Sequence, residues 1–352
     1  MKTSLCFQFH NAVVFEVRSN IPHVLEFFNS EYGYHRVDNG CRKRNHNATV
    51  APLPVVELTY LNKINPVQEY NHYTHKFLAH WLYQVQVSPE RVTIKVSGNK
   101  LSVPMVHHMM VHPSLRYLAS QHGFLLLHAG AVARKGKSLI FSGRGGAGKT
   151  TVTSLVLAYG NRWSLHADDY VFLKPGPFSF AYQTRSHLYR NLLLWVPEVK
   201  SRLTPWELTR VEFFGFVRKW SGERFKWPVR LSAERLWPGS TIQDFAVPVS
   251  VLLLRKGNQS SAELEQEKDI EQVAAELIEM NFNEARHFIS LLDKTNAIPD
   301  FSGWLADWKL AERRLLLEIL RRTPVYTLKL PVTNSRSELS KQLLSILDEL
   351  AA

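Results

Sequence analysis

The stretch FSGRGGAGKT, residues 141–150, carries the strongest structural signal in the sequence. Its last eight residues match the phosphate-binding pattern G-x-x-x-x-G-K-[ST]. An apolar run, residues 138–142, precedes the glycines, and a segment with helical spacing, residues 151–159, follows them and ends at Gly160. Because the pattern is meaningful when it lies between a strand and a helix, we expect an α/β fold.

Each residue type in this loop has a physical role. Glycines adopt positive φ and let backbone N–H groups surround an anion, and the N-terminus of the following helix favours the same anion. Lys149 would reach the β- and γ-phosphates, and Thr150 would offer its hydroxyl to Mg²⁺. We therefore predict binding of a nucleoside triphosphate with Mg²⁺, most simply ATP. The alternative interpretation is a glycine-rich turn with an incidental lysine. The residues expected at the nucleotide are Gly143, Arg144, Gly145, Gly146, Ala147, Gly148, Lys149, Thr150 and Thr151.

Two adjacent carboxylates, Asp168 and Asp169, interrupt an apolar segment that covers residues 164–173. In folds with such a loop, an acid on a neighbouring strand faces the metal ion. Two carboxylates side by side suggest two roles: one orders Mg²⁺, and the other accepts a proton from an attacking hydroxyl. The alternative is a solvated turn at the end of a strand. His128, in the apolar segment 124–133, is by itself better interpreted as a core histidine.

The order of these motifs resembles the HPr kinase/phosphorylase family. H-A-G at residues 128–130 is followed by the glycine loop and then by A-D-D at residues 167–169. The closer resemblance is to kinase-like relatives that phosphorylate serine in peptides, including those from lasso-peptide gene clusters. The resemblance covers residues 124–174 with specific motifs and continues weakly to Pro331. It implies a P-loop core of the HPr kinase-like, PEP carboxykinase-like type.

The resemblance also implies roles for individual residues. Lys149 and the loop backbone would hold the triphosphate, and Thr150 and Asp168 would lie at the metal ion. Asp169 would accept the proton of the substrate serine, with His128 beside it. The chain departs from the family pattern at Gly145, where serine is usual, and it lacks the family's later glycine-containing signature. These departures argue against HPr as the substrate and against the reverse phosphorylase reaction.

The predicted reaction is ATP-dependent transfer of a phosphoryl group to a hydroxyl, preferentially a serine of a peptide or small protein. One alternative keeps the same catalytic centre but changes the acceptor to free serine, another small alcohol or a nucleic-acid end. Another alternative is a non-catalytic module that senses ATP. Glu198 is a candidate for a further metal ligand only because of its position in the chain.

The chain is strongly basic, with 43 Lys and Arg against 31 Asp and Glu and a net charge of +12. This balance favours anionic partners such as nucleotides, nucleic acid, acidic peptides or membrane headgroups. Residues 185–237 concentrate the effect and hold five of the nine tryptophans. Arg185, Lys226 and Arg230 are candidates for stabilising a transferring phosphoryl group. The alternative is a solvated basic face with tryptophans in the core.

We expect two domains: a smaller α/β or α+β domain of unknown role at residues 1–108, and the kinase domain at residues 109–352. His107, His108 and His112 are better interpreted as a linker or the start of a surface helix than as a metal site. The elements expected in the first domain are strands within 5–17 and at 55–61, helices at 21–32 and 77–85, and a hairpin at Gly98-Asn99. Those expected late in the second are strands at 247–254 and 325–330 and helices at 270–292, 305–321 and 337–350.

No apolar run is long enough to span a membrane, and Glu16 and Arg18 argue against a signal peptide. Two cysteines, Cys6 and Cys41, are too few for a disulfide framework. We therefore expect a cytoplasmic protein; a homo-oligomer stays open.

Overall fold

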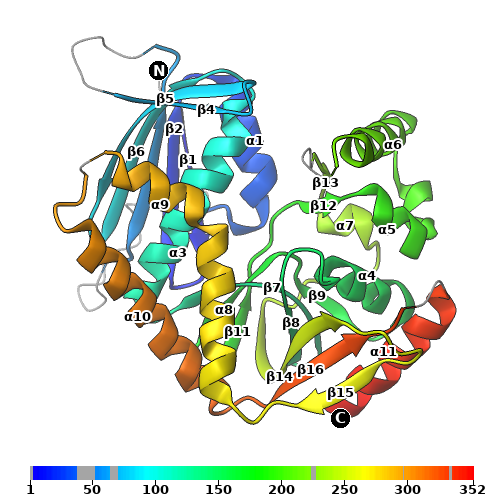
Figure 1. Cartoon of the computed structure of the whole chain (residues 1–352). Coiled ribbons are helices and arrows are strands. Elements are labelled where there is room, and N and C mark those ends of the chain that lie inside the picture. Colours follow the sequence, from blue (N-terminus) through cyan, green and yellow to red (C-terminus); the bar gives the residue numbers. More distant parts are fainter. Residues whose placement is uncertain (1–2, 38–51, 64–69, 223–226, 296, 333–334) are drawn as a thin grey trace. The chain divides into compact units, whose positions relative to one another are not determined.

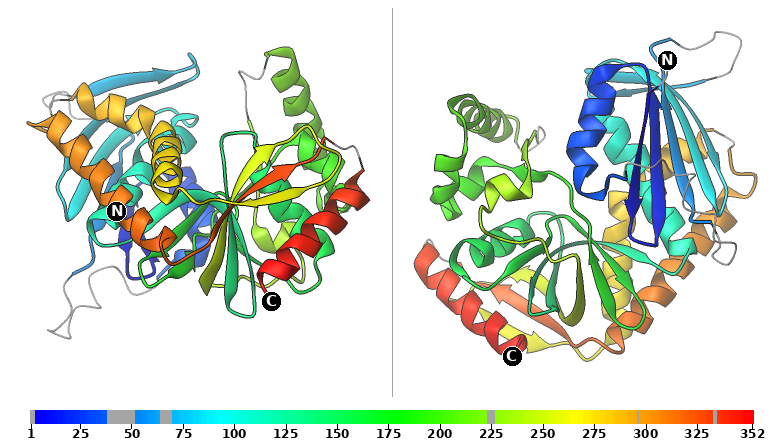
Figure 2. Two further views of the ribbon diagram at one scale, coloured as in Figure 1. Left: turned by 60° about the horizontal axis from the view of Figure 1, so that its bottom comes forward. Right: turned by 180° about the vertical axis from the view of Figure 1, so that it is seen from behind.

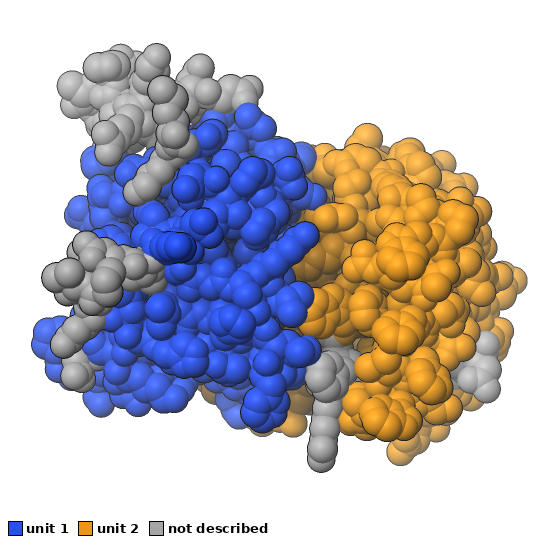
Figure 3. Space-filling view, turned by 90° about the horizontal axis from the view of Figure 1, so that it is seen from above, with its two compact units in different colours: residues 1–126, 278–316 blue, residues 127–277, 317–352 orange. Residues whose placement is uncertain are grey.

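The computed structural model describes residues 3–37, 52–63, 70–222, 227–295, 297–332 and 335–352 (Figure 1). It divides into two compact units, shown in Figure 3. Unit 1 comprises residues 1–126 and 278–316, and unit 2 comprises residues 127–277 and 317–352. These limits differ from the boundary expected after residue 108, because residues 109–126 and 278–316 pack with the N-terminal part. The mixed sheets and helices confirm the α/β class at a coarse level.

Unit 1 is built on a six-stranded sheet in the order β1-β2-β3-β6-β5-β4. The expected strands within 5–17 and at 55–61 and the helix at 21–32 are confirmed, since α1 covers Pro22–Tyr32. Cys6 in β1 is disulfide-bonded. The strands are β1 (Thr3–Phe9), β2 (Val13–Ser19), β3 (Val55–Tyr60), β4 (Asn71–His75), β5 (Ala79–Val87) and β6 (Arg91–Gly98).

The helix expected at residues 77–85 is wrong, because β5 occupies this stretch. Ala79, Trp81, Tyr83 and Val85 are buried and the residues between them are more exposed, which is the period of two of a strand. The hairpin expected at Gly98-Asn99 is also wrong. The chain turns there into a helix, with the Ser102 N–H donating to Asn99 Oδ1 at 3.1 Å.

Residues 102–121 form one nearly continuous helical segment. It consists of α2 (Ser102–Val106), a π-helical turn (His107–Val111) and α3 (His112–Gln121). The expectation of a linker or surface helix is wrong for His107 and His112, since both are buried. His107 Nε2 lies 2.7 Å from Tyr32 Oη, which gives this histidine a structural partner in the core of unit 1.

A buried ion pair explains why residues 278–316 belong to unit 1. Arg116 of α3 pairs with Glu312 of α10 (Phe301–Leu320) at 2.6 Å, and both side chains are almost completely buried. Trp308 Nε1 and Asn281 Nδ2 also donate to the Glu312 carboxylate, at 2.9 and 3.2 Å. Two further helices precede α10, namely α8 (Ile270–Glu284) and α9 (Arg286–Asp293), so the single helix expected at 270–292 is divided at Ala285.

Unit 2 is built on an eight-stranded sheet in the order β11-β10-β7-β8-β14-β16-β15, with β9 paired to β7. β8, β14 and β16 are parallel neighbours, and α11 (Arg336–Leu350) lies beside this part of the sheet (Figure 2). The strands expected at 247–254 and 325–330 and the helix at 337–350 are confirmed. The strands are β7 (Leu125–Arg134), β8 (Lys137–Ser142), β9 (Ser164–Ala167), β10 (Tyr170–Lys174), β11 (Phe178–Ala181), β14 (Phe245–Lys256), β15 (Glu263–Gln266) and β16 (Val325–Leu330).

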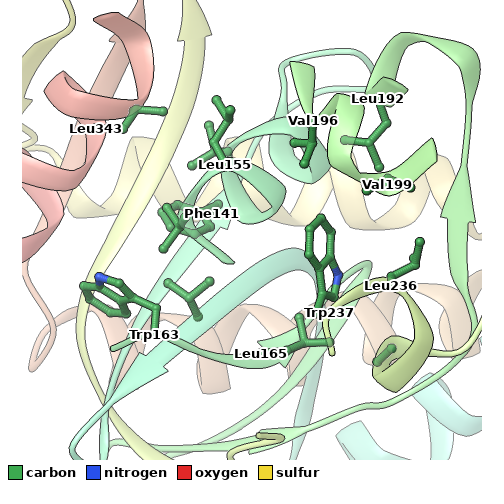
Figure 4. Packing of buried hydrophobic residues seen from close by; sticks show 14 of the residues in the cluster. Phe141, Leu155, Trp163, Leu165, Leu192, Val196, Val199, Leu236, Trp237 and Leu343 are labelled. Atoms are coloured by element: carbon green, nitrogen blue, oxygen red, sulfur yellow. The ribbon is translucent and has the colours of Figure 1, made fainter. Parts of the chain in front are cut away.

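One hydrophobic cluster packs the helices of unit 2 against this sheet (Figure 4). Leu155 of α4 (Lys149–Tyr159) and Leu343 of α11 meet Phe141 of β8 in this cluster. Leu192 of α5 (Arg190–Trp195) joins it as well. The basic segment continues with a 3₁₀ helix (Pro197–Arg202), α6 (Pro205–Trp220) and α7 (Ala233–Leu236), and β12 (Ser186–Leu188) pairs with β13 (Val229–Leu231). Within the described ranges, no helix is both long and apolar enough to cross a membrane.

Candidate functional site

The glycine loop connects β8 directly to α4, so the expected order of strand, glycine loop and helix is confirmed. Gly146 and Gly148 have φ of 84° and 109°, a region that favours glycine, and Gly148 is the N-cap of α4. A Cβ added at Gly148 would lie 3.0 Å from Leu330 Cδ1 of β16. The backbone conformation and the close strand therefore both favour glycine at this position.

The glycine loop has an exposed stretch of backbone, whereas the side chain of its lysine is buried. Arg144, Gly145 and Gly146 are exposed, and a Cβ added at Gly145 or Gly146 meets no atom within 4 Å. Lys149 is buried, and its Nζ donates to the Gly143 carbonyl at 2.7 Å. The lysine amine thus lies inside the curve of the loop, at the N-terminus of α4.

The strand β7 brings the three predicted motifs together. Its Ala129 pairs with Ser142, the last residue of β8 before the loop, and Ser142 Oγ donates to the His128 carbonyl at 3.3 Å. On the other side of β7, the Ala129 N–H donates to the Asp169 carbonyl at 3.0 Å. His128 and the carboxylate pair are therefore held next to the start of the glycine loop.

Gly130, the last residue of H-A-G, is the closest point between these elements. A Cβ at Gly130 would lie 2.7 Å from Thr153 Oγ1 of α4 and 3.3 Å from the Asp168 carbonyl. Glycine at this position allows both α4 and the carboxylate turn to approach β7. In the sequence, Gly130 was notable only as part of the H-A-G motif, and nothing there indicated why a glycine is needed.

Asp168 and Asp169 form the expected break between two strands, β9 and β10. Burial raises the pKa of Asp168 to about 6, and the charge of Asp169 adds to the rise. Hydrogen bonds from the Ser186 hydroxyl and the His187 backbone N–H act in the opposite direction on this pKa. The Asp169 side chain is 41% exposed. Both residues are half-buried, but desolvation acts strongly on the Asp168 carboxyl, whereas the Asp169 carboxylate is accessible.

His128 lies beside the accessible carboxyl. Its Nδ1 is 3.7 Å from Asp169 Oδ1, which is an ion pair when the imidazole is protonated. Its ring meets the Tyr170 ring edge to face, with centroids 4.8 Å apart. His128 therefore lies at the edge of this cluster, which fits its contacts better than the interpretation as an isolated core histidine.

The candidate residues from the basic segment are not all brought to the carboxylates. The Arg185 guanidinium donates to the Arg230 carbonyl, which links the paired strands β12 and β13. Glu198 accepts a hydrogen bond from Tyr159 Oη at 3.0 Å. Tyr159 ends α4, about 15 Å along the helix axis from Lys149, so Glu198 lies away from the glycine loop. Lys226 lies outside the described residues.

A pocket of about 200 Å³ lies next to β12, the strand that contacts Asp168. The Arg218 guanidinium lies over the Tyr189 ring at 5.1 Å. Burial raises the pKa of Tyr189, the charge of Asp169 adds to the rise, and Arg218 and Arg230 oppose it. The charge of Asp169 thus acts on the Tyr189 hydroxyl.

The pocket was not predicted from the sequence, although its segment was notable there for basic and aromatic residues. The lining residues are Leu188, Tyr189, Arg190, Asn191, Val211, Phe214, Gly215, Arg218, Lys219 and Trp227.

Thr150 and Asp168, the two predicted metal ligands, are both oxygen donors. The Thr150 hydroxyl and the Asp168 carboxyl supply oxygen, which Mg²⁺ prefers, and Mg²⁺ with phosphates needs only one or two protein ligands. In the part of the chain that the structure describes, no group of three or more His, Cys, Asp or Glu could hold a metal ion. A dedicated protein-only metal centre therefore has no support there.

No protein-family model matches this chain, and a comparison with curated proteins finds no significant match.

Proposed function

We propose that the protein is an ATP-dependent kinase with an HPr kinase-like core that phosphorylates a hydroxyl, preferentially a serine of a peptide or small protein. The observation that carries the proposal is the convergence on β7 of the glycine loop, His128 and the carboxylate pair. A phosphoryl-transfer enzyme needs these parts: an anion cradle with a lysine, an oxygen ligand for Mg²⁺, and a proton acceptor.

In this proposal the glycine loop holds the triphosphate. The exposed residues 144–146 and the N-terminus of α4 together form the candidate anion site. Lys149 would exchange its bond to the Gly143 carbonyl for the β- and γ-phosphates. Thr150 and Asp168 would hold Mg²⁺, which neutralises charge on the phosphate oxygens.

Asp169 is the proposed proton acceptor, since its carboxyl is accessible and next to His128. The acceptor oxygen bonds to the γ-phosphorus while the bond from that phosphorus to the β–γ bridging oxygen breaks, and ADP leaves. The hydroxyl proton passes to Asp169. His128, 3.7 Å away, would orient this carboxylate for the transfer.

The pocket beside β12 is the proposed place for part of the acceptor. Arg190, Arg218 and Lys219 line it, with Arg190 ion-paired to Glu212 at 2.6 Å, and Tyr189 and Trp227 add aromatic surface. A peptide with an acidic side chain near its serine suits this lining better than free serine or a small neutral alcohol does.

Two rival functions make different predictions. A kinase that acts on a nucleic-acid end would bind oligonucleotides with an affinity that falls steeply with salt. A module that only senses ATP would bind ATP·Mg²⁺ without turnover. The adjacent Asp168 and Asp169 favour catalysis over sensing, because a sensor has little need of an accessible carboxylate beside a strongly desolvated one.

The test is intact-mass spectrometry of serine peptides with acidic flanks, small proteins, free serine and oligonucleotides after incubation with the protein and ATP·Mg²⁺. We expect a gain of one phosphoryl mass on a peptide or protein, and no gain with Asp169→Asn. Retained ATP binding with no gain on any acceptor would contradict the kinase and favour the sensor. A gain on oligonucleotides alone would move the proposal to the nucleic-acid acceptor.

A further inference from the structure

Helix α6 is a well-capped helix that begins at Pro205. The Glu207 N–H donates to Thr204 Oγ1 at 3.3 Å, and the Thr204 N–H donates to Glu207 Oε2 at 2.9 Å. This reciprocal pair is a capping box, which satisfies two N–H groups at the start of the helix. The helix has 16 residues and is therefore about 24 Å long.

One side of α6 exposes four large aromatic side chains, here called the aromatic stripe. Trp206, Phe213, Phe216 and Trp220 are 69%, 58%, 64% and 83% exposed. Their spacing of seven, three and four residues places them on one side of a helix. The helix buries Val211 on another side. The packing of α6 through its Val211 side thus leaves the aromatic stripe exposed.

The charges around the aromatic stripe are predominantly positive. Both acidic residues of α6 are ion-paired at 2.6 Å, Glu207 with Arg235 and Glu212 with Arg190. The helix also carries Arg210 and Lys219, whereas its third basic residue, Arg218, lies on the Val211 side over the Tyr189 ring. A surface that combines exposed aromatic rings with net positive charge is complementary to an apolar surface bordered by anions.

The contact area of the aromatic stripe helps to distinguish a lipid surface from a second copy of the chain as the partner. Four partly exposed aromatic side chains offer about 500–600 Å² of contact area. A stable protein interface buries about 800 Å² on each partner, so this stripe alone is small for a second copy of the chain. A helix with Trp and Phe on one side and Lys or Arg beside it is typical of helices that lie in the plane of a lipid surface.

We propose that α6 binds an anionic lipid surface, with Trp206, Phe213, Phe216 and Trp220 inserted among the acyl chains and Arg210 and Lys219 near the headgroups. The binding is peripheral. Helix α6 contributes no residue of the glycine loop or the carboxylate pair, although Arg218 and Lys219 of this helix line the pocket proposed for the acceptor.

The test is sedimentation of the full chain with vesicles of phosphatidylcholine and phosphatidylserine, compared with vesicles of phosphatidylcholine alone. We expect pelleting with the anionic vesicles, and less pelleting at higher salt. Trp206→Ser combined with Trp220→Ser should weaken this binding about tenfold or more. Phe77→Ser is the matched control: Phe77 is 97% exposed but lies in unit 1, so its removal should leave vesicle binding unchanged.

Four outcomes would overturn the proposal. These are no pelleting with either vesicle, equal pelleting with both, full binding by the Trp206→Ser/Trp220→Ser variant, or light scattering that shows a dimer dependent on these tryptophans in place of lipid binding. Thermal unfolding followed by circular dichroism checks that the variant is folded, which is expected because both side chains are exposed.

Discussion

Asp169 Oδ1 lies 3.7 Å from His128 Nδ1, while the Ala129 N–H, one residue further along β7, donates to the Asp169 carbonyl. One strand therefore fixes both the backbone of Asp169 and the imidazole beside its carboxylate. A carboxylate that is accessible and held next to a histidine is suitable for accepting a proton.

Asp169→Asn should abolish phosphoryl transfer and leave ATP binding intact. Loss of a positioned general base lowers turnover about 10²–10⁴-fold. ATP affinity should stay near the wild-type value, because the amide keeps the size of the side chain and the glycine loop is unchanged. Steady-state kinetics and calorimetric ATP binding measure the two effects. Turnover that survives in the variant would rule out Asp169 as the base.

Lys149→Ala should weaken ATP binding about tenfold to a hundredfold, the loss expected for a hydrogen bond to a charged group. The variant should remain folded, since the bond to the Gly143 carbonyl that it loses contributes only about 1 kcal/mol. Calorimetry with ATP·Mg²⁺ measures the affinity. Lys100→Ala removes an exposed lysine in unit 1 and is the control. Equal affinities for the two variants would contradict the role of Lys149.

The glycine loop and the carboxylate turn could be predicted because their determinants are local. Positive φ at Gly146 and Gly148 needs only glycine, and the adjacent Asp168 and Asp169 interrupt an apolar run. The meeting of these motifs on β7 was implied only by the family resemblance. No local pattern states that Ser142 pairs with Ala129.

What the sequence could not predict depends on contacts between separate segments of the chain. The stretch around Trp81 has apolar residues that fit both periods, and pairing of β5 with β4 and β6 decides in favour of a strand. The pocket at Tyr189 is lined by residues 188–191 together with residues of α6 and Trp227, which come later in the chain. Likewise, the inclusion of residues 278–316 in unit 1 rests on Glu312 meeting Arg116, far away in the chain.

Gly130→Ala should destabilise unit 2 by about 1–3 kcal/mol, because its Cβ would overlap Thr153 Oγ1 at 2.7 Å. The Thr153 hydroxyl is buried and has no hydrogen-bond partner within the described ranges, so Thr153→Ala alone should have a small effect. The double variant should recover a large part of the loss. Urea unfolding of the three variants measures this coupling, and simple additivity of the two single changes would contradict it.

Glu312→Ala should destabilise unit 1 by about 3–5 kcal/mol, because the Arg116 guanidinium would remain charged and buried without its carboxylate. A double change, Arg116→Met with Glu312→Leu, should recover part of this loss by replacing both charges with apolar groups, while Trp308 Nε1 and Asn281 Nδ2 would still lack the Glu312 acceptor. Thermal unfolding compares the variants. Arg91→Ala breaks a more exposed pair with Glu57 and should change stability by less than about 1 kcal/mol. Equal losses for Glu312→Ala and Arg91→Ala would contradict the assignment.

The raised pKa of Asp168 predicts an unusual dependence of stability on pH. An unfolded Asp titrates near 3.9, whereas the pKa of folded Asp168 is about 6. Between these values the folded state binds more protons than the unfolded state, so this group lowers the free energy of unfolding as pH rises from about 4 to about 6. The loss amounts to at most about 3 kcal/mol and stays constant above that range.

Asp168→Asn keeps the shape of the side chain without the charge. The variant should therefore be more stable than the wild type above pH 6 by up to this amount, and equal to it near pH 3 to 4. Urea unfolding of both proteins across this range measures the difference, with Asp244→Asn, an aspartate outside the site, as the control. A difference between wild type and Asp168→Asn that does not change with pH would show that Asp168 ionises as an ordinary surface carboxyl.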